Sequence, residues 1–279
     1  MNVATPPLAP AIGSAPAIQS VSALSARRGC VIGIFSDSGV GKTSLLRTLP
    51  AARTIIQSWD NGTVPLSAPG YPTNEAGEFR PAWDGAVTPG TPETRKQFTD
   101  WILTAQHPYT TVVIDNLTSM EKIEIFKRAQ FSEVTIRDYG DASVAVRGTI
   151  MRLCELAQKG INVIFLFHCR TDVKGAEGER FPSLSDKLAR EVFGWLDMVG
   201  YMFIQPDGKT RALQFAPTNL IHAKTRFPEV RDFEVLDLSD IIGRVLGARR
   251  AKPVAAPAPV AVVTPPATVT PKPEAKKEK

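Results

Sequence analysis

The chain has 279 residues, of which 43% are hydrophobic and 22% charged, and its formal net charge is +5. This balance is ordinary for a globular protein, and it permits nucleic-acid binding without requiring it. No apolar run approaches the roughly 20 residues of a membrane-spanning helix. The three cysteines are scattered without metal-ligand spacing, which argues against a disulfide framework or zinc site and for a reducing cytoplasm.

Both ends of the chain are predicted to be disordered. Residues 1–25 are rich in Ala, Pro and Ser, and residues 251–279 are rich in Pro, Ala and Lys. Such segments bury too little apolar surface to fold, and the C-terminal one has the composition of an extended tail. We therefore expect one folded domain over residues 26–250.

Strands and helices alternate within that domain. Strand-length apolar runs occur at 30–35, 54–59, 110–115, 162–167 and 198–204. Helical periodicity occurs at 42–50, 92–106, 118–131, 142–159, 185–196 and 238–248. Runs that are apolar throughout suit strands buried on both faces, so the pattern predicts an α/β fold with a mostly parallel sheet flanked by helices.

Two further segments qualify this pattern. Residues 60–91 are rich in Gly and Pro and are predicted to form a long surface insertion. Asp207-Gly208 lies between two apolar runs, which is typical of a tight β-hairpin turn. The sheet is therefore expected to end in a C-terminal antiparallel β-hairpin.

The first strand leads into a phosphate-loop motif, Ser36-Asp37-Ser38-Gly39-Val40-Gly41-Lys42-Thr43. It matches G-x-x-x-x-G-K-[ST] except that Ser36 replaces the first Gly, at the point where the strand ends. Lys42 is expected to reach the β- and γ-phosphates, and Thr43 to help hold Mg²⁺. The predicted nucleotide-binding residues are Ser38, Gly39, Val40, Gly41, Lys42, Thr43 and Ser44.

A second half of the phosphate site follows the third strand. Asp115 comes after an uncharged, mostly aliphatic run, and a carboxylate at that strand end would bind Mg²⁺ together with Thr43. The alternative is that Asp115 caps the next helix, although Asn116 or Thr118 could supply that cap.

The remaining motifs help to distinguish between the classes of nucleotide-binding protein. The chain lacks the NKxD motif of GTPases, and Asp115 does not begin the DxxG motif that GTPases carry at this place. An arginine-containing stretch, residues 169–180, keeps a small-molecule or nucleotide kinase with a lid open as an alternative. Asp60 follows the second strand and His168 follows the fourth. Asp60 could instead be a turn residue, and His168 a core histidine.

Taken in order, these motifs resemble phage-encoded P-loop ATPases of the RecA superfamily, which include single-strand annealing proteins. The resemblance covers residues 28–245 and includes "VVIDNL", "NVIFLFH", a "DYG" at 138–140 before a long helix, and "AKTR" at 223–226. It implies a RecA-like core that binds ATP and Mg²⁺ and hydrolyses ATP in the cytoplasm of a bacterial host. It also implies a homo-oligomer, either a ring or a filament.

The resemblance also implies roles for individual residues. Asp115 would serve the metal, Asp60 would be the general base, and His168 would sense the γ-phosphate. Lys224 and Arg226 would enter the ATP site of a neighbouring subunit and stabilise charge there. Their alternative is a pair of surface cations on an edge strand.

Single-stranded DNA is the partner that the resemblance implies, with the loop from residue 169 to 184 as the contact. The candidate DNA-binding residues are Arg170, Lys174, Arg180, Phe181 and Lys187. Basic side chains would meet phosphates and Phe181 would stack on a base, although acidic neighbours make a merely solvated surface the alternative. A non-hydrolysing ATP-dependent switch or loader for a phage replication or single-strand-binding protein also remains open.

Overall fold

The structure is a computed structural model that describes residues 28–67, 82–130, 132–172 and 178–251. The predictions for residues 1–25 and for almost all of the C-terminal tail therefore lie outside the described residues. Within the described ranges, none of the helices combines the length and apolar character needed to cross a membrane.

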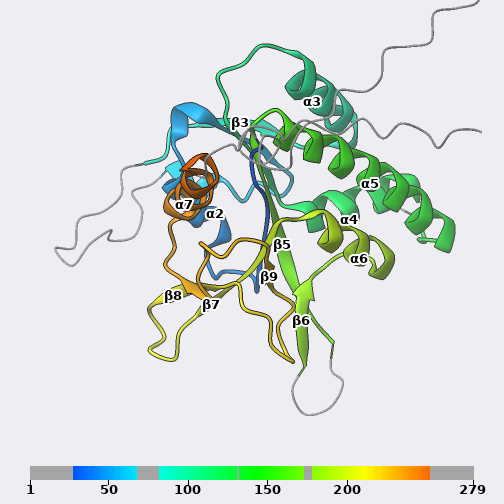
Figure 1. Ribbon diagram of the computed structural model, residues 1–279. Coiled ribbons are helices and arrows are strands. Elements are labelled where there is room, and N and C mark those ends of the chain that lie inside the picture. Colours follow the sequence, from blue (N-terminus) through cyan, green and yellow to red (C-terminus); the bar gives the residue numbers. More distant parts are fainter. Residues whose placement is uncertain (1–27, 68–81, 131, 173–177, 252–279) are drawn as a thin grey trace, which may run out of the picture.

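The ten strands of the described ranges form one sheet, whose main path has the order β10-β8-β7-β1-β5-β4-β2-β3, with β6 on β5 and β9 on β7 (Figure 1). Its strands are β1 (Val31–Ser36), β2 (Thr54–Ser58), β3 (Ala86–Pro89), β4 (Thr111–Asp115), β5 (Asn162–Asp172), β6 (Glu179–Pro182), β7 (Met198–Ile204), β8 (Arg211–Gln214), β9 (Lys224–Thr225) and β10 (Phe233–Glu234). The pairs from β7 through β3 are parallel, whereas β6, β8, β9 and β10 pair antiparallel.

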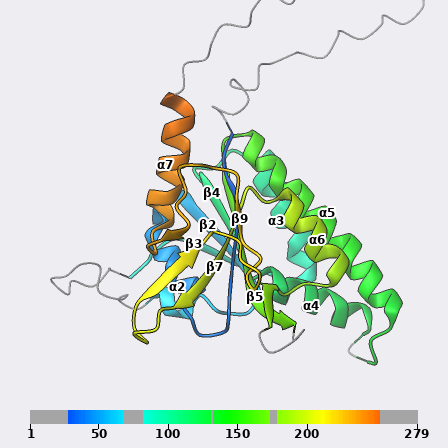
Figure 2. The same cartoon turned by 60° about the horizontal axis from the view of Figure 1, so that its bottom comes forward.

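Helices cover both faces of the sheet and so make three layers (Figure 2). The helices are α2 (Lys42–Leu45), α3 (Pro92–Thr104), α4 (Leu117–Arg128), α5 (Ile136–Gln158), α6 (Asp186–Trp195) and α7 (Leu238–Ala251), with 3₁₀ turns at Leu46–Thr48, Ala51–Arg53 and Val64–Ser67. Helices α3 to α6 lie on one face, and α2 and α7 lie on the other (Figures 1 and 2). The predicted fold class, an α/β protein with a mostly parallel sheet and antiparallel strands at its C-terminal end, is confirmed.

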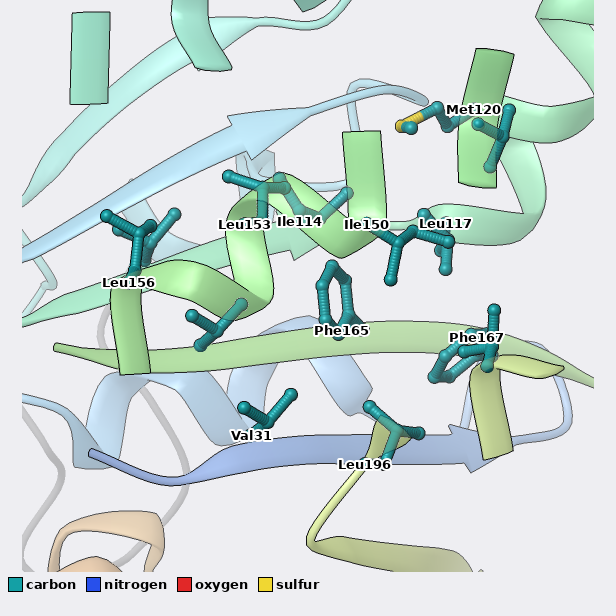
Figure 3. Close-up of a cluster of buried hydrophobic side chains, with 14 of the residues drawn as sticks. Val31, Ile114, Leu117, Met120, Ile150, Leu153, Leu156, Phe165, Phe167 and Leu196 are labelled. Atoms are coloured by element: carbon teal, nitrogen blue, oxygen red, sulfur yellow. The ribbon is translucent and has the colours of Figure 1, made fainter. Parts of the chain in front are cut away.

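Successive residues of each buried strand supply two separate cores, because strand side chains alternate between the faces. Phe165 and Phe167 of β5 pack toward α5, beside Ile150 (Figure 3). Ile164 and Leu166 of the same strand belong to the opposite core. Helix α7 contributes to that second core through Leu238, Ile241, Ile242 and Val245. The continuous apolarity of these strands thus reflects burial on both faces.

The order of the strands brings four chain segments together at one edge of the sheet. β1, β2, β4 and β5 are parallel, so their carboxyl ends meet at the same edge. β5 lies between β1 and β4, and its His168 pairs in register with Ser36 at the end of β1. His168 lies within β5, which continues to Asp172, rather than after the strand as predicted. It is nevertheless a spatial neighbour of the residues that follow β1, β2 and β4.

Several elements differ from the sequence prediction. Helix α5 begins at Ile136 rather than at 142, because Thr135 and Asp138 form a capping box, and the "DYG" at 138–140 lies inside the helix. The predicted insertion at 60–91 contributes β3, an edge strand parallel to β2. The predicted loop at 169–184 is largely a hairpin of β5 and β6, with residues 173–177 outside the described part.

Candidate functional site

The phosphate loop connects β1 to α2 with two glycines in the left-handed region. Gly39 has φ 80° and Gly41 has φ 108°, conformations that side-chain-bearing residues rarely adopt. Between them, the Val40 carbonyl accepts a hydrogen bond of 2.7 Å from the Arg211 Nε of β8. The loop backbone is therefore shaped by its own glycines and contacted by the C-terminal hairpin.

The Lys42 ammonium is buried within this loop. Its Nζ donates to the Ser36 carbonyl at 3.0 Å, to the Ser36 hydroxyl at 2.9 Å and to the Asp37 carbonyl at 3.1 Å. Burial lowers the pKa of Lys42, and the carboxylates of Asp115 and Asp37 oppose that shift. Ser36, which replaces the first glycine of the motif, thus supplies through its hydroxyl an acceptor for this lysine that glycine would lack.

Thr43 and Asp115 meet across the loop. The Thr43 hydroxyl donates to Asp115 Oδ2 at 2.8 Å, and Asp115 is 2% exposed. Burial raises the pKa of Asp115 to about 6, with a smaller contribution from the nearby Asp60 carboxylate and an opposing hydrogen bond from Thr43. A desolvated carboxylate beside a hydroxyl oxygen suits a bound divalent ion.

These two side chains fit Mg²⁺ in the manner of a nucleotide site. Mg²⁺ commonly uses one or two protein oxygen ligands and takes the rest from phosphates and water. No group of three or more His, Cys, Asp or Glu side chains able to hold a metal occurs among the described residues. A metal bound here would therefore depend on nucleotide oxygens as well as on Thr43 and Asp115.

Asp60 and His168 face the same cavity, which has a volume of about 360 Å³. Its lining is Ser38, Gly39, Gly41, Lys42, Thr43, Ser44, Asp60, Gly62, Pro65, Asp115, Asn116 and His168. Burial lowers the pKa of His168, and the Lys42 cation lowers it further. The structure thus brings together the predicted base, sensor, lysine and metal ligands from four segments of the chain, and their individual roles stay predictions.

Asn116 is the member of this site that the sequence presented only as a possible helix cap. It does cap α4, since its Oδ1 accepts from the Ser119 backbone N–H at 2.7 Å. Its Nδ2 also contacts Asp60 Oδ2 and lies 3.2 Å from His168 Nε2. A polar residue directly after the strand-end aspartate was the available signal for this second role.

Four of the five candidate DNA-binding residues lie on the described part of the β5–β6 hairpin and the start of α6. The Arg170 guanidinium pairs with Asp172 and Asp186 and lies 4.4 Å from the centre of the Phe181 ring. Two of the predicted DNA contacts, Arg170 and Phe181, are therefore brought together by the hairpin.

The other three candidates are placed differently. Arg180 contacts the Tyr201 hydroxyl and lies 3.7 Å from Asp37 of the phosphate loop. Lys187 is exposed on α6. Lys174 lies outside the described residues. DNA binding by any of the five candidates stays a prediction.

Lys224 and Arg226 lie away from the phosphate loop of their own chain. β9 pairs with the beginning of β7, and the phosphate loop lies at the opposite, carboxyl edge of the parallel strands. Lys224 contacts the Phe193 carbonyl, and Arg226 donates to the Gly194 carbonyl at 2.8 Å. Their predicted action on a neighbouring subunit is not tested by a single chain and stays a prediction.

Comparison with known families gives a match over most of the folded domain. The model of a family described as "AAA domain" matches residues 28–227, which is well over half of the chain. Comparison with the curated proteins gave no match. The matched range begins just before β1 and ends just after β9, so it contains every residue of the phosphate-loop cavity. The chain therefore belongs to the AAA domain family, whose members are P-loop proteins of the nucleotide-binding ATPase type.

Proposed function

We propose that the protein is a Mg²⁺-dependent ATPase of the RecA-like type that acts on single-stranded DNA. Its role would be in phage recombination, annealing or replication, in the cytoplasm of a bacterial host. The observation that carries the ATPase part is the meeting of five predicted residues around one cavity, namely Lys42, Thr43, Asp60, Asp115 and His168. The DNA and phage parts are supported by the resemblance in motif order.

Each functional group in the site would have its own role in ATP hydrolysis. Lys42 would leave its loop acceptors to neutralise phosphate charge, and Thr43 and Asp115 would hold Mg²⁺, which supplies further charge neutralisation when bound. Asp60 would orient a water molecule and accept its proton. Both Asp60 oxygens already accept one hydrogen bond, from the Gly62 backbone and from the Asn116 side chain, and each retains a lone pair for water.

The hairpin of β5 and β6 is where DNA binding would be linked to this site. Arg180 approaches Asp37 of the phosphate loop, and Phe181 lies against Arg170 on the same strand pair. Arg170 already pairs with two carboxylates, so it would have to exchange those partners to bind a DNA phosphate. DNA binding would therefore change the ion pairs of the hairpin, and Arg180 on the same hairpin would be the link to the phosphate loop.

The test is ATP turnover of the full chain with and without single-stranded DNA, together with light scattering to follow assembly. We expect DNA to raise turnover, and Lys42→Ala to abolish it, because the phosphate charge loses its buried cation. Lys96→Ala is the matched control, since Lys96 pairs with Asp100 on the surface of α3 and should leave turnover unchanged.

Three results would count against the proposal. ATP turnover that does not change when DNA is added, together with no DNA retained in a gel shift at low salt, would contradict the proposed action on single-stranded DNA. ATP binding without any turnover would favour the non-hydrolysing switch, and phosphate transfer to a small acceptor would favour the kinase.

A further inference from the structure

The orientation of the Asn116 side chain is determined by the helix that it caps. The Ser119 backbone N–H, 2.7 Å away, can only donate, so the atom facing it must be the Asn116 amide oxygen. The amide nitrogen therefore points away from the helix and into the phosphate-loop cavity. This removes the usual ambiguity between the two ends of an asparagine amide.

The amide nitrogen meets two acceptors in the cavity. One is Asp60 Oδ2, and the other is His168 Nε2 at 3.2 Å. An amide NH₂ carries two hydrogens and no acceptor, so both contacts require the partner atom to accept. Nε2 of His168 must therefore be unprotonated, and a neutral ring with a bare Nε2 carries its hydrogen on Nδ1.

Nδ1 of His168 lies on the phosphate-loop side of the ring, 3.5 Å from the Ser38 hydroxyl oxygen. Phosphate oxygens and the Ser38 oxygen accept hydrogen bonds, so an Nδ1–H suits this side, whereas a bare Nδ1 would direct a lone pair at an anion. The neutral ring agrees with the surroundings, because burial and the nearby Lys42 cation both lower the pKa of His168.

We propose that Asn116 is a positioning residue that holds His168 in the Nδ1–H tautomer, so that the ring directs a donor at the phosphate loop. The same amide holds the Asp60 carboxylate through its other hydrogen. The catalytic consequence rests on the proposed ATPase function, whereas the tautomer is a property of the protein without nucleotide. Asn116 acts through these two side chains and makes no contact with a reacting atom.

The tautomer is tested directly by long-range ¹H–¹⁵N spectra of the full chain with labelled histidine and no nucleotide. The chain has three histidines, so the His168→Gln variant assigns the His168 signal as the one that disappears. We expect Nδ1 of His168 to carry the hydrogen. A wild-type spectrum with the hydrogen on Nε2 would overturn the proposal without any substitution at Asn116.

Two substitutions keep an oxygen that can cap α4 and remove the amide hydrogens. Asn116→Ser should let both tautomers appear, and Asn116→Asp, which places an acceptor opposite Nε2, should favour the hydrogen on Nε2. Thr135→Ala removes the cap of α5 instead and should leave the His168 signal unchanged. An unaltered Nδ1–H tautomer in both Asn116 variants would overturn the proposal.

Turnover provides the second readout. We expect Asn116→Ser to lower kcat by about 10- to 100-fold, by analogy with the loss of a group that orients a metal-ligating side chain. In a His168→Ala background the same substitution should cost clearly less, because part of its effect acts through His168. Equal losses of kcat in both backgrounds would show that Asn116 does not act through His168. A wild-type protein that hydrolyses no ATP would refute the proposed function and leave the spectra to decide the tautomer.

Discussion

Asp115 is a buried carboxylate whose environment suits a bound cation but lowers the stability of the folded protein. Its pKa of about 6 lies roughly two units above that of an exposed aspartate, mainly because of burial. Above pH 6 the folded protein must hold this carboxylate ionised, which costs about 3 kcal/mol. As the pH falls through 6 the folded state takes up a proton before the unfolded state does, so this cost is relieved.

We therefore expect Asp115→Asn to stabilise the nucleotide-free protein at pH 7. The amide keeps an acceptor for the Thr43 hydroxyl and removes the desolvated charge, so thermal unfolding should shift upward by a few degrees. The shift should shrink toward about pH 5, where the wild-type carboxyl is largely protonated. The additional stabilisation by Mg²⁺ and ATP should be lost.

Asp197 provides the matched control for this prediction. It is similarly buried, at 1% exposed, but its carboxylate accepts from Arg28, Arg226 and the Val31 backbone N–H. Asp197→Asn should therefore destabilise the protein, because it removes the charge that balances two guanidinium groups. A lower melting temperature for Asp115→Asn at pH 7 would contradict the burial argument.

At the scale of elements, the β7–β8 hairpin supports the phosphate loop. Arg211 begins β8, and its Nε donates to the Val40 carbonyl at 2.7 Å, between the two glycines with positive φ. A cationic donor on a loop carbonyl holds the loop in one conformation before nucleotide arrives. The antiparallel hairpin is thus joined to the site although it contributes none of the predicted catalytic residues.

Arg211→Ala should accordingly weaken nucleotide binding. Loss of a charge-assisted hydrogen bond is worth about 1.5–3 kcal/mol, so the Kd for ATP should rise by roughly 10- to 100-fold. Lys209→Ala, in the exposed turn of the same hairpin, should change the Kd little. Titration with a fluorescent ATP analogue measures both variants, and equal affinities would show that the loop needs no support from β8.

For the whole molecule, the location of Lys224 and Arg226 makes assembly the decisive question. Both lie far along the strands from their own phosphate loop, at the beginning of β7. A role in catalysis therefore requires a second copy of the chain. Within one chain they attach β9 to the end of α6 through the carbonyls of Phe193 and Gly194.

Mixing two variants that this role predicts to be inactive on their own tests it. Lys42→Ala lacks a working phosphate loop, and Lys224→Ala/Arg226→Ala lacks the cations. If the cations act on a neighbour, a mixture of the two variants should recover part of the ATP turnover, because some interfaces combine an intact loop with intact cations. Turnover of the double variant alone at the wild-type rate would show that the pair serves only the fold.

The sequence by itself determined the features that depend on local chemistry. The long buried strands, the helices, the glycines of the phosphate loop and the strand-end Asp115 follow from apolar runs, helical periodicity and residues with special backbone freedom. The short strands β3, β6 and β10 were not predicted, and a strand at Lys224 was only an alternative, because two to four residues carry too little pattern.

Only the tertiary structure decided which side chains meet. Asn116 joins Asp60 and His168, which lie 56 and 52 residues away along the chain, because β4, which it follows, lies between β2 and β5 in the sheet. Ser36 became a partner of Lys42 because the phosphate loop folds back on itself, which its sequence pattern alone did not show. Local pattern specifies an element, whereas strand order and burial set its neighbours, and hydrogen bonds across the site depend on those neighbours.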